Sequence, residues 1–233
     1  MGNTGEVERI KAAYERRKKK IPSQQYSLFN RANLFMVQRR DEKVLEALVK
    51  HGVTNLEGKR ILDVGCGEGG ELRNFIRYGA RPENISGVDL LLDRIETAKK
   101  ISPNIDFHCG DASRLPYENE TFDIVIQFTM FTSILDRGMK KSIASEMMRV
   151  LKPDGILLWY DYYMNNPRNL DVRGIKKGEI FELFRGCHIY LKRITLAPPL
   201  ARAIAPRSAI LCEVLEKIPQ LCTHYLGIFR KGR

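Results

Sequence analysis

The chain has 233 residues, of which 43% are hydrophobic and 29% are charged, and its formal net charge at pH 7 is +11. This length fits one domain, and the apolar fraction is large enough for a buried core, which excludes wholesale disorder. No apolar run approaches the roughly 20 residues of a membrane span, and the charged N-terminus does not resemble a signal peptide. The five scattered cysteines favour reduced thiols and a cytoplasmic location over a disulfide framework.

The excess of basic residues is the first feature that bears on partners. A positive balance attracts phosphates, anionic lipids or acidic substrates, although a basic surface that only keeps the protein in solution explains it equally well. Residues 16–20 read RRKKK, and a second basic set is dispersed over residues 168–207. Neither stretch interleaves aromatics and glycines as RNA-recognition modules do, so nucleic acid is not favoured as a partner.

Helical patterns come first along the chain. Residues 6–20 form a charged helical pattern that ends before Pro22, and residues 26–50 form a second one with apolar residues at helical intervals. We assign residues 1–52 to an N-terminal helical lid or cap and residues 53–233 to the main domain.

From residue 60 short β-branched runs alternate with amphipathic segments. The predicted strands are residues 61–66, 85–90, 105–110, 122–128 and 156–162, and the predicted helices between them are residues 71–78, 93–100 and 138–151. This alternation predicts parallel βαβ units with right-handed crossovers, in a sheet that is covered on both faces.

The last part of the chain is less regular. We expect a helix over residues 176–186 and two strands at residues 189–196 and 224–231, which would end the sheet in an antiparallel pair. A helical insertion near residues 198–219 separates these strands. Its apolar residues are not obviously on one side, so we expect it to be buried and not to lie on a membrane surface.

The most informative stretch is ILDVGCGEGG, residues 61–70. Gly65 and Gly67 let the chain bend tightly between a strand and a helix, and they leave room for a ligand against the main chain. With Gly70 they also satisfy the G-x-G-x-x-G spacing of dinucleotide sites, so NAD is an alternative ligand. Asp63 argues against NAD, because a carboxylate at the strand end repels a pyrophosphate and suits an ammonium group.

Further polar residues follow the next predicted strands. Asp89 ends the second strand, where a carboxylate can accept both hydroxyls of a ribose. Asp111 follows the third strand and can accept the exocyclic amine of adenine, while Ala112 offers a backbone N–H to a ring nitrogen. Gln127 and Phe128 stand at the carboxyl end of the fourth strand. Since ligands of open α/β sheets bind at these strand ends, all of these residues should meet in one crevice.

Together these stretches resemble the successive motifs of class I S-adenosylmethionine-dependent methyltransferases, of the small-molecule type found in bacterial glycan and natural-product pathways. The resemblance covers about residues 55–163 and rests on ILDVGCGEGG, GVDLLLDRI, GDASRLPYENETFDIVI and RVLKPDGILLWYD. It implies a Rossmann-like, doubly wound α/β fold with seven strands, mostly parallel with an antiparallel last strand, and helices on both faces. It also implies S-adenosylmethionine as the cofactor, with S-adenosylhomocysteine as product, and a donor site made of Asp63, Gly65, Cys66, Gly67, Asp89, Leu90, Asp111, Ala112, Gln127 and Phe128.

Two segments rich in aromatic and polar residues are the candidates for the acceptor site. The loop after the fifth strand faces the strand ends, and its arginines suit an anionic acceptor through bidentate hydrogen bonds. Helices before the first strand commonly cover the donor in the family that the chain resembles, although an amphipathic helix packed on the sheet is the alternative. The substrate-binding candidates are Tyr26, Phe29, Asn33, Tyr160, Asn165, Arg168 and Arg173.

Asp161, Tyr162 and His224 are the candidates for a catalytic base, since a hydroxyl or amine acceptor has to lose a proton. A structural role is the alternative for His224. No cluster has metal-ligand spacing, so no metal is expected. The expected function is methyl transfer to a small-molecule acceptor, a sugar or natural-product hydroxyl or amine; RNA methylation and non-catalytic binding of S-adenosylmethionine are the alternatives. The acceptor, the methylated atom and the oligomeric state, for which a homodimer is one option, stay open.

Overall fold

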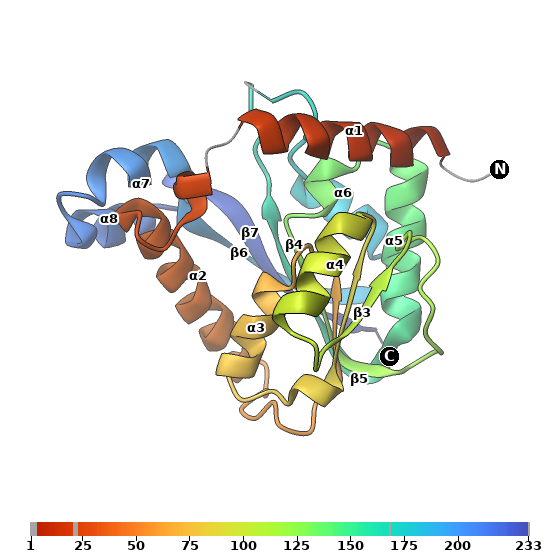
Figure 1. Cartoon of the computed structure of the whole chain (residues 1–233). Coiled ribbons are helices and arrows are strands. Elements are labelled where there is room, and N and C mark those ends of the chain that lie inside the picture. Colours follow the sequence, from red (N-terminus) through yellow and green to blue (C-terminus); the bar gives the residue numbers. More distant parts are fainter. Residues whose placement is uncertain (1–3, 21–22, 168, 233) are drawn as a thin grey trace.

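The computed structural model describes residues 4–20, 23–167 and 169–232. Its strands form one seven-stranded sheet in the order β3-β2-β1-β4-β5-β7-β6 (Figure 1). Strands β1 to β5 are parallel to one another, whereas β7 is antiparallel to both β5 and β6. The strands are β1 (Ile61–Val64), β2 (Ile85–Asp89), β3 (Asp106–Cys109), β4 (Phe122–Phe128), β5 (Leu151–Tyr162), β6 (Cys187–Leu196) and β7 (Cys222–Lys231). The predicted fold class, with its antiparallel last strand, is confirmed.

Helices lie on both faces of the sheet (Figure 1). The helices are α1 (Thr4–Lys20), α2 (Arg31–Lys50), α3 (Gly70–Arg77), α4 (Leu92–Ile101), α5 (Arg137–Val150), α6 (Lys177–Leu183), α7 (Pro198–Ile204) and α8 (Ala209–Glu216). Alternate residues of β5 show the two layers. Leu157 and Trp159 pack in the cluster that includes α5 and α6, whereas Leu158 and Tyr160 pack in the cluster that includes α2, α3 and α4. Because both faces are buried, the ends of the strands are left as the place for a ligand.

Two boundaries differ from the sequence prediction for identifiable reasons. The helix predicted from residue 26 begins at Arg31, because Asn30 caps it by accepting hydrogen bonds from the N–H groups of Ala32 and Asn33 at 3.0 and 3.3 Å. Strand β5 begins at Leu151, five residues before the predicted start at residue 156, with a shift of register against β4. Residues 152–155, KPDG, are typical of a turn and obscured the beginning of the strand in the sequence; they lie within this irregular stretch.

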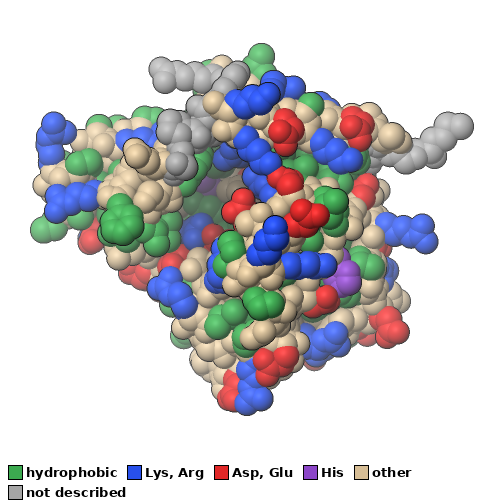
Figure 2. Space-filling view, viewed as in Figure 1, with side chains coloured by type: hydrophobic (Ala, Val, Ile, Leu, Met, Phe, Trp, Pro, Cys, Tyr) green, Lys and Arg blue, Asp and Glu red, His purple; other side chains and the backbone are tan. Residues whose placement is uncertain are grey.

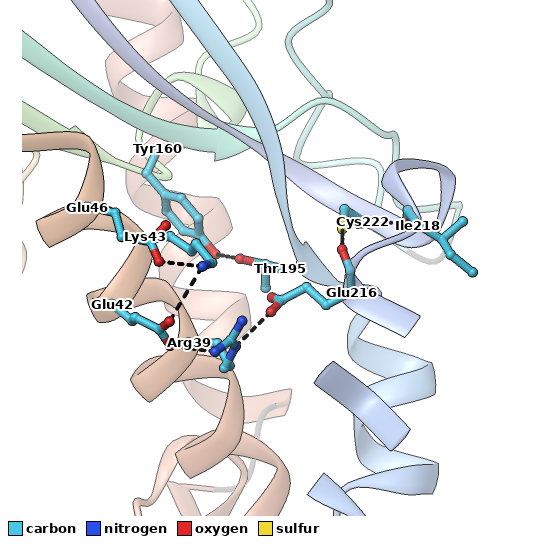
Figure 3. Close-up of polar contacts among 9 residues, drawn as sticks. All are labelled: Arg39, Glu42, Lys43, Glu46, Tyr160, Thr195, Glu216, Ile218 and Cys222. Carbon is cyan, nitrogen blue, oxygen red and sulfur yellow. Dashed lines mark hydrogen bonds and ion pairs between the residues drawn. The ribbon is translucent and has the colours of Figure 1, made fainter. Parts of the chain in front are cut away.

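The insertion between β6 and β7 consists of two short helices, α7 and α8, which lie against the first half of α2 (Figure 1). Ala32 and Phe35 of α2 share a small core with Ala201 of α7 and Cys212 of α8. Figure 3 shows a polar link across the same interface, in which Arg39 of α2 pairs with Glu216 of α8 at 2.9 Å. None of the described helices is both long enough and apolar enough to cross a bilayer.

Helix α1 crosses above the carboxyl ends of the parallel strands (Figure 1). Glu6 accepts the N–H of Leu135 at 2.5 Å, and Tyr14 shares a hydrogen bond of 3.1 Å with Ser133. These contacts join α1 to the loop that follows β4. The first helix is therefore a roof over the strand ends.

Candidate functional site

A cavity of about 580 Å³ opens at the carboxyl ends of β1, β2 and β4, beneath α1. Its volume is within the range of small-molecule sites. Six residues predicted for the donor site line it, and α1 and the turn before α2 add further side chains. The lining from these groups comprises Gly65, Asp89, Leu90, Asp111, Ala112 and Phe128, with Ile10, Tyr14, Arg17 and Tyr26 above them.

The turn after β1 has a backbone that needs glycine. Gly65 and Gly67 have φ of 83° and 54°, in the left-handed region that side chains disfavour. The N–H groups of Gly65 and Cys66 donate to the carbonyl of Val88 at 2.8 and 3.0 Å, which holds the turn against β2. Burial raises the pKa of the Cys66 thiol, so this cysteine is a protonated packing residue and not a nucleophile.

The Asp89 carboxylate is held in a fixed orientation beside the glycine turn. Its Oδ2 accepts the N–H of Gly67 at 2.8 Å, and its Oδ1 accepts the N–H of Leu91 at 2.9 Å. Each oxygen keeps a second lone pair that can accept a ligand hydroxyl. Asp111 is anchored in a similar way, since it accepts the N–H of Ser113 at 2.8 Å. Backbone N–H groups of the protein therefore orient both acids at the cavity.

Asp63 has a buried oxygen without a partner. The residue is 2% exposed, and its Oδ1 has no hydrogen-bond partner. Burial, followed by the negative charges of Glu71 and Asp89, raises the pKa of Asp63 well above its usual range. Gln127 is similar, because it is fully buried and its Nε2 is unpartnered. Buried polar atoms of this kind are costly, and a ligand that pairs with them would remove the cost.

Arg40 of α2 brings a positive charge to the same place. Its guanidinium pairs with Glu71 at 2.8 Å and with Asp41 at 3.2 Å, and it lies 5.4 Å from the ring centroid of Phe128 and 5.7 Å from that of Tyr160. Its Nε is buried without a partner. Sequence reasoning missed this residue, because nothing in the local pattern distinguishes it from the other arginines of α2.

Arg94 of α4 was missed for the same reason. It lines the cavity, and its guanidinium lies 4.5 Å from the ring centroid of Tyr14 on α1. Its Nε is also buried and unpartnered. The pairing of α4 with the roof helix is visible only in three dimensions.

The side chains of Tyr160, Tyr162 and His224 form an aromatic group near Tyr26, which lines the cavity. The His224 ring stacks on Tyr160, with centroids 4.5 Å apart, and lies 3.7 Å from the ring of Tyr162. Burial, assisted by the charge of Arg40, lowers the pKa of His224 to about 3, so its imidazole is neutral at physiological pH. Burial and the neighbouring phenol of Tyr26 raise the pKa of Tyr162, against the opposing charges of two arginines, Arg202 and Arg17.

Tyr160 and His224 are only 5% and 3% exposed, whereas Tyr162 is half-buried. Figure 2 shows a hollow between the lobe formed by α7 and α8 and the rest of that face. The electrostatic neighbours of Tyr162 come from α1, from the turn before α2 and from α7. The predicted residues Tyr26, Tyr162 and His224 are therefore brought together, although they are far apart in the sequence.

Asp161, a second base candidate, is placed differently. It is 1% exposed, and its carboxylate accepts the N–H of Thr132 at 3.3 Å and the N–H of Tyr162 at 2.8 Å. Burial raises its pKa to about 7, although these hydrogen bonds oppose the shift. It joins β5 to the turn after β4 and does not line the cavity. Tyr160 is likewise buried, with its hydroxyl 2.9 Å from Oγ1 of Thr195 (Figure 3).

The other substrate-binding candidates do not gather at the hollow. Phe29 is fully exposed, and the Asn33 amide supports the preceding turn by donating to the carbonyl of Tyr26 at 2.8 Å. Asn165 accepts the N–H of Gly174 at 2.9 Å within its own loop, and Arg173 pairs with Glu179 at 3.5 Å. Arg168 lies outside the described residues.

Comparison with known proteins bears independently on the family of this chain. Residues 61–155 match the family model described as a methyltransferase domain. The phthiotriol/phenolphthiotriol dimycocerosates methyltransferase of Mycobacterium leprae is 37% identical over 114 residues, which cover 48% of this chain and 41% of that protein. The demethylmenaquinone methyltransferase of Renibacterium salmoninarum is 32% identical over 111 residues, covering 48% of this chain and 44% of that protein. The chain thus matches less than half the length of these relatives.

A solved structure extends the similarity beyond the matched segment. A TehB-like SAM-dependent methyltransferase from Corynebacterium glutamicum superposes with a TM-score of 0.56 at 19% identity, covering 82% of this chain and 86% of that one. At this identity the superposition speaks for the fold. All ten residues predicted for the donor site, from Asp63 to Phe128, lie within the segment that matches the family model.

Proposed function

We propose that this chain, which carries in residues 61–155 the methyltransferase domain of the class I S-adenosylmethionine-dependent enzymes, transfers a methyl group to a hydroxyl of an apolar small-molecule acceptor. S-adenosylmethionine is the cofactor of that family. The observation that carries the proposal is the buried Oδ1 of Asp63, which has no hydrogen-bond partner and lies near the end of β1, just before the glycine turn.

The residues present fit this cofactor. Asp63 would pair with the ammonium of its methionine end, and the Nε of Arg40 would donate to its carboxylate, so two unpartnered buried atoms would each gain a partner. Asp89 would accept the ribose hydroxyls, and Asp111 and Ala112 would hold the adenine. When bound, the cofactor supplies a methyl group already activated on a sulfonium. The protein's own part is then mainly proximity and orientation.

The acceptor would bind in the hollow beside Tyr26, Tyr162 and His224. Aromatic walls favour an apolar molecule. The neutral imidazole of His224 can accept a hydrogen bond from an acceptor hydroxyl and orient its oxygen, whereas Tyr162, whose pKa is raised, stays protonated. Two relatives support an apolar acceptor, since their names give dimycocerosates and demethylmenaquinone.

Calorimetric titration with S-adenosylhomocysteine tests the donor half. We expect binding by the wild type and at least about tenfold weaker binding by Asp89→Asn, because each tenfold corresponds to about 1.4 kcal/mol and a carboxylate accepts stronger hydrogen bonds than an amide. Asp154→Asn, an exposed carboxylate where β5 begins, is the matched control and should bind as the wild type does.

The acceptor half is tested by transfer of labelled methyl from S-adenosylmethionine to a panel of hydroxylated lipids, quinols and free sugars. Labelling of the lipids or quinols alone would support the apolar acceptor. Labelling of sugars alone would overturn it and leave the donor site standing. Equal affinity of wild type and Asp89→Asn for S-adenosylhomocysteine would overturn the donor site itself.

A further inference from the structure

The insertion between β6 and β7 was expected to be buried, and the structure corrects this: only one side of α8 is covered. Cys212 is fully buried, whereas Ile210, Leu211 and Val214 are 76%, 47% and 51% exposed, and Ile218 just after the helix is 44% exposed. Residues three and four apart lie on the same side of a helix, so Ile210, Leu211 and Val214 form an apolar stripe on α8, and Ile218 adds exposed apolar area just after the helix.

A second exposed apolar element belongs to the same lobe. The turn before α2 presents Leu28 and Phe29, which are 55% and 101% exposed. The guanidinium of Arg31 donates to the carbonyl of Pro206 at 3.0 Å, which fixes this turn against the end of α7. Figure 2 shows apolar and basic side chains side by side on this lobe. We call the following set the lobe surface: Leu28, Phe29, Ile210, Leu211, Val214 and Ile218.

Cations dominate the charge around the lobe surface. Exposed basic side chains come from α7, from the loop before α8, from the end of α8 and from the start of α2; they are Arg202, Arg207, Lys217 and Arg31. The insertion contains two carboxylates, and the side chain of Glu216 is 7% exposed and pairs with Arg39 at 2.9 Å. Only Glu213 is left as an exposed acid on α8. Apolar side chains flanked by cations are typical of helices that lie at an anionic membrane surface.

The turn that carries part of the lobe surface also reaches the cavity. Tyr26 lines the cavity, is half-exposed, and precedes Leu28 and Phe29 in the same short turn. An apolar acceptor dissolved in a bilayer would therefore meet the hollow next to the side chains that touch the lipid. Exposed apolar area on a protein needs such an explanation when it is contiguous and rimmed by charge.

We infer that the lobe surface docks on an anionic lipid bilayer, with Phe29 and the α8 stripe entering the headgroup region and the surrounding cations contacting lipid phosphates. The inference rests on the proposed function in one respect: the purpose that we assign to docking is delivery of an apolar acceptor. Binding to lipid itself is independent of methyl transfer.

Co-sedimentation with phosphatidylcholine vesicles, with and without phosphatidylglycerol, tests the inference on the whole chain. We expect binding to the anionic vesicles that weakens as salt is added. The triple variant Phe29→Ser, Ile210→Ser, Val214→Ser should bind roughly tenfold more weakly or worse, and so should Arg202→Gln, Arg207→Gln, Lys217→Gln, because both apolar burial and charge attraction contribute.

Matched controls remove the same kinds of side chain elsewhere. One is Leu92→Ser, Ile101→Ser, Leu170→Ser, which changes apolar residues that are 58%, 53% and 88% exposed. The other is Lys99→Gln, Lys100→Gln, Lys141→Gln, which removes three exposed cations outside the lobe. Affinity for S-adenosylhomocysteine, measured on every variant, separates a lost docking surface from a lost fold or donor site.

The outcomes are distinct. Loss of vesicle binding in the lobe variants alone, with S-adenosylhomocysteine affinity kept, supports the inference. No binding by the wild type, or equal loss in the controls, overturns it. A dimer in sedimentation velocity that the Phe29, Ile210 and Val214 variant abolishes would assign the surface to a second copy of the chain and also overturn it. Failure of S-adenosylhomocysteine binding with vesicle binding intact would instead remove the proposed function.

Discussion

At the scale of single residues, the site is marked by polar atoms that the fold leaves without partners. Oδ1 of Asp63, Nε of Arg40, Nε of Arg94 and Nε2 of Gln127 are all buried and unpaired. The chain bears a cost in stability at these positions, since a buried polar group without a hydrogen bond is unfavourable. They lie around the cavity end of the sheet, where a ligand can pair with them; the other described residues with unpartnered buried side-chain atoms are His51, Tyr117 and Trp159.

Asp63→Asn should separate stability from binding. The folded-state pKa of Asp63 is raised above its unfolded value, so the free energy of unfolding falls as pH rises from the usual aspartate range toward the raised value. The asparagine variant lacks this fall. We therefore expect urea denaturation to show that this variant is at least as stable as the wild type near neutral pH. Its affinity for S-adenosylhomocysteine should be at least about tenfold lower.

The exposed substitution Asp154→Asn should change neither quantity. A variant of Asp63 that is less stable at neutral pH and binds normally would show that the carboxylate stabilises the fold and does not hold the ligand.

At the scale of elements, helix α2 connects the α7–α8 lobe to the core of the sheet. Its first half packs on α7 and α8, and its second half contributes Val44 and Leu48 to the core beneath the sheet. Arg40 lies between these halves, and its guanidinium pairs with Glu71 in the first turn of α3, just after the glycine turn. Helix α2, together with β6, thus holds the α7–α8 lobe against the rest of the molecule.

Arg39→Gln should loosen this connection. Arg39 pairs with Glu216 at 2.9 Å across the interface, and Glu216 is 7% exposed (Figure 3). Removing the cation leaves a largely buried carboxylate unpaired, which should cost about 2 kcal/mol in the free energy of unfolding. Lys43→Gln is the control, because its partner Glu46 is half-exposed and the loss should be about 0.5 kcal/mol. Equal effects of the two substitutions in urea denaturation would contradict a structural role of the Arg39–Glu216 pair.

At the scale of the whole molecule, the donor cavity exists because α1 closes it. The open edge of a parallel sheet provides the glycine turn and the acids, and α1 adds Ile10 and Tyr14 above them. The roof is attached by the packing of Ile10 in the core and by polar links, of which Arg16 with Asp171 at 2.7 Å is an exposed ion pair. Exposed ion pairs of this kind contribute little, so ligand contacts should add noticeably to the order of α1.

Hydrogen exchange should show this coupling. On addition of S-adenosylhomocysteine, amide exchange should slow in α1 together with residues 63–70 and 89–91, because the ligand would contact both the floor and the roof of the cavity. Helix α8, which does not line the cavity, is the internal control and should exchange at an unchanged rate. Protection confined to residues 63–70 and 89–91 would show that α1 does not contact the ligand.

The sequence by itself determined the strands along the chain and the class of sheet that they form, and it predicted the edge of that sheet where the donor site would lie. The reason is that these features are local: buried parallel strands are apolar runs, left-handed turns need glycine at Gly65 and Gly67, and acids such as Asp89 stand at strand ends where parallel strands meet. The antiparallel end of the sheet followed equally from two late strands. Each of these inferences depends on residues that are neighbours in the chain.

Only the tertiary structure decided which side chains from other segments reach the site. Arg40 and Arg94 are unremarkable in sequence, yet helix packing brings both to the cavity region, whereas the same packing turns Phe29 outward and buries Asp161 under Thr132. It also decided that α8 is covered on one side only. Contacts between distant segments depend on how elements pack, and hydrophobic patterning constrains which face is buried without specifying what that face meets.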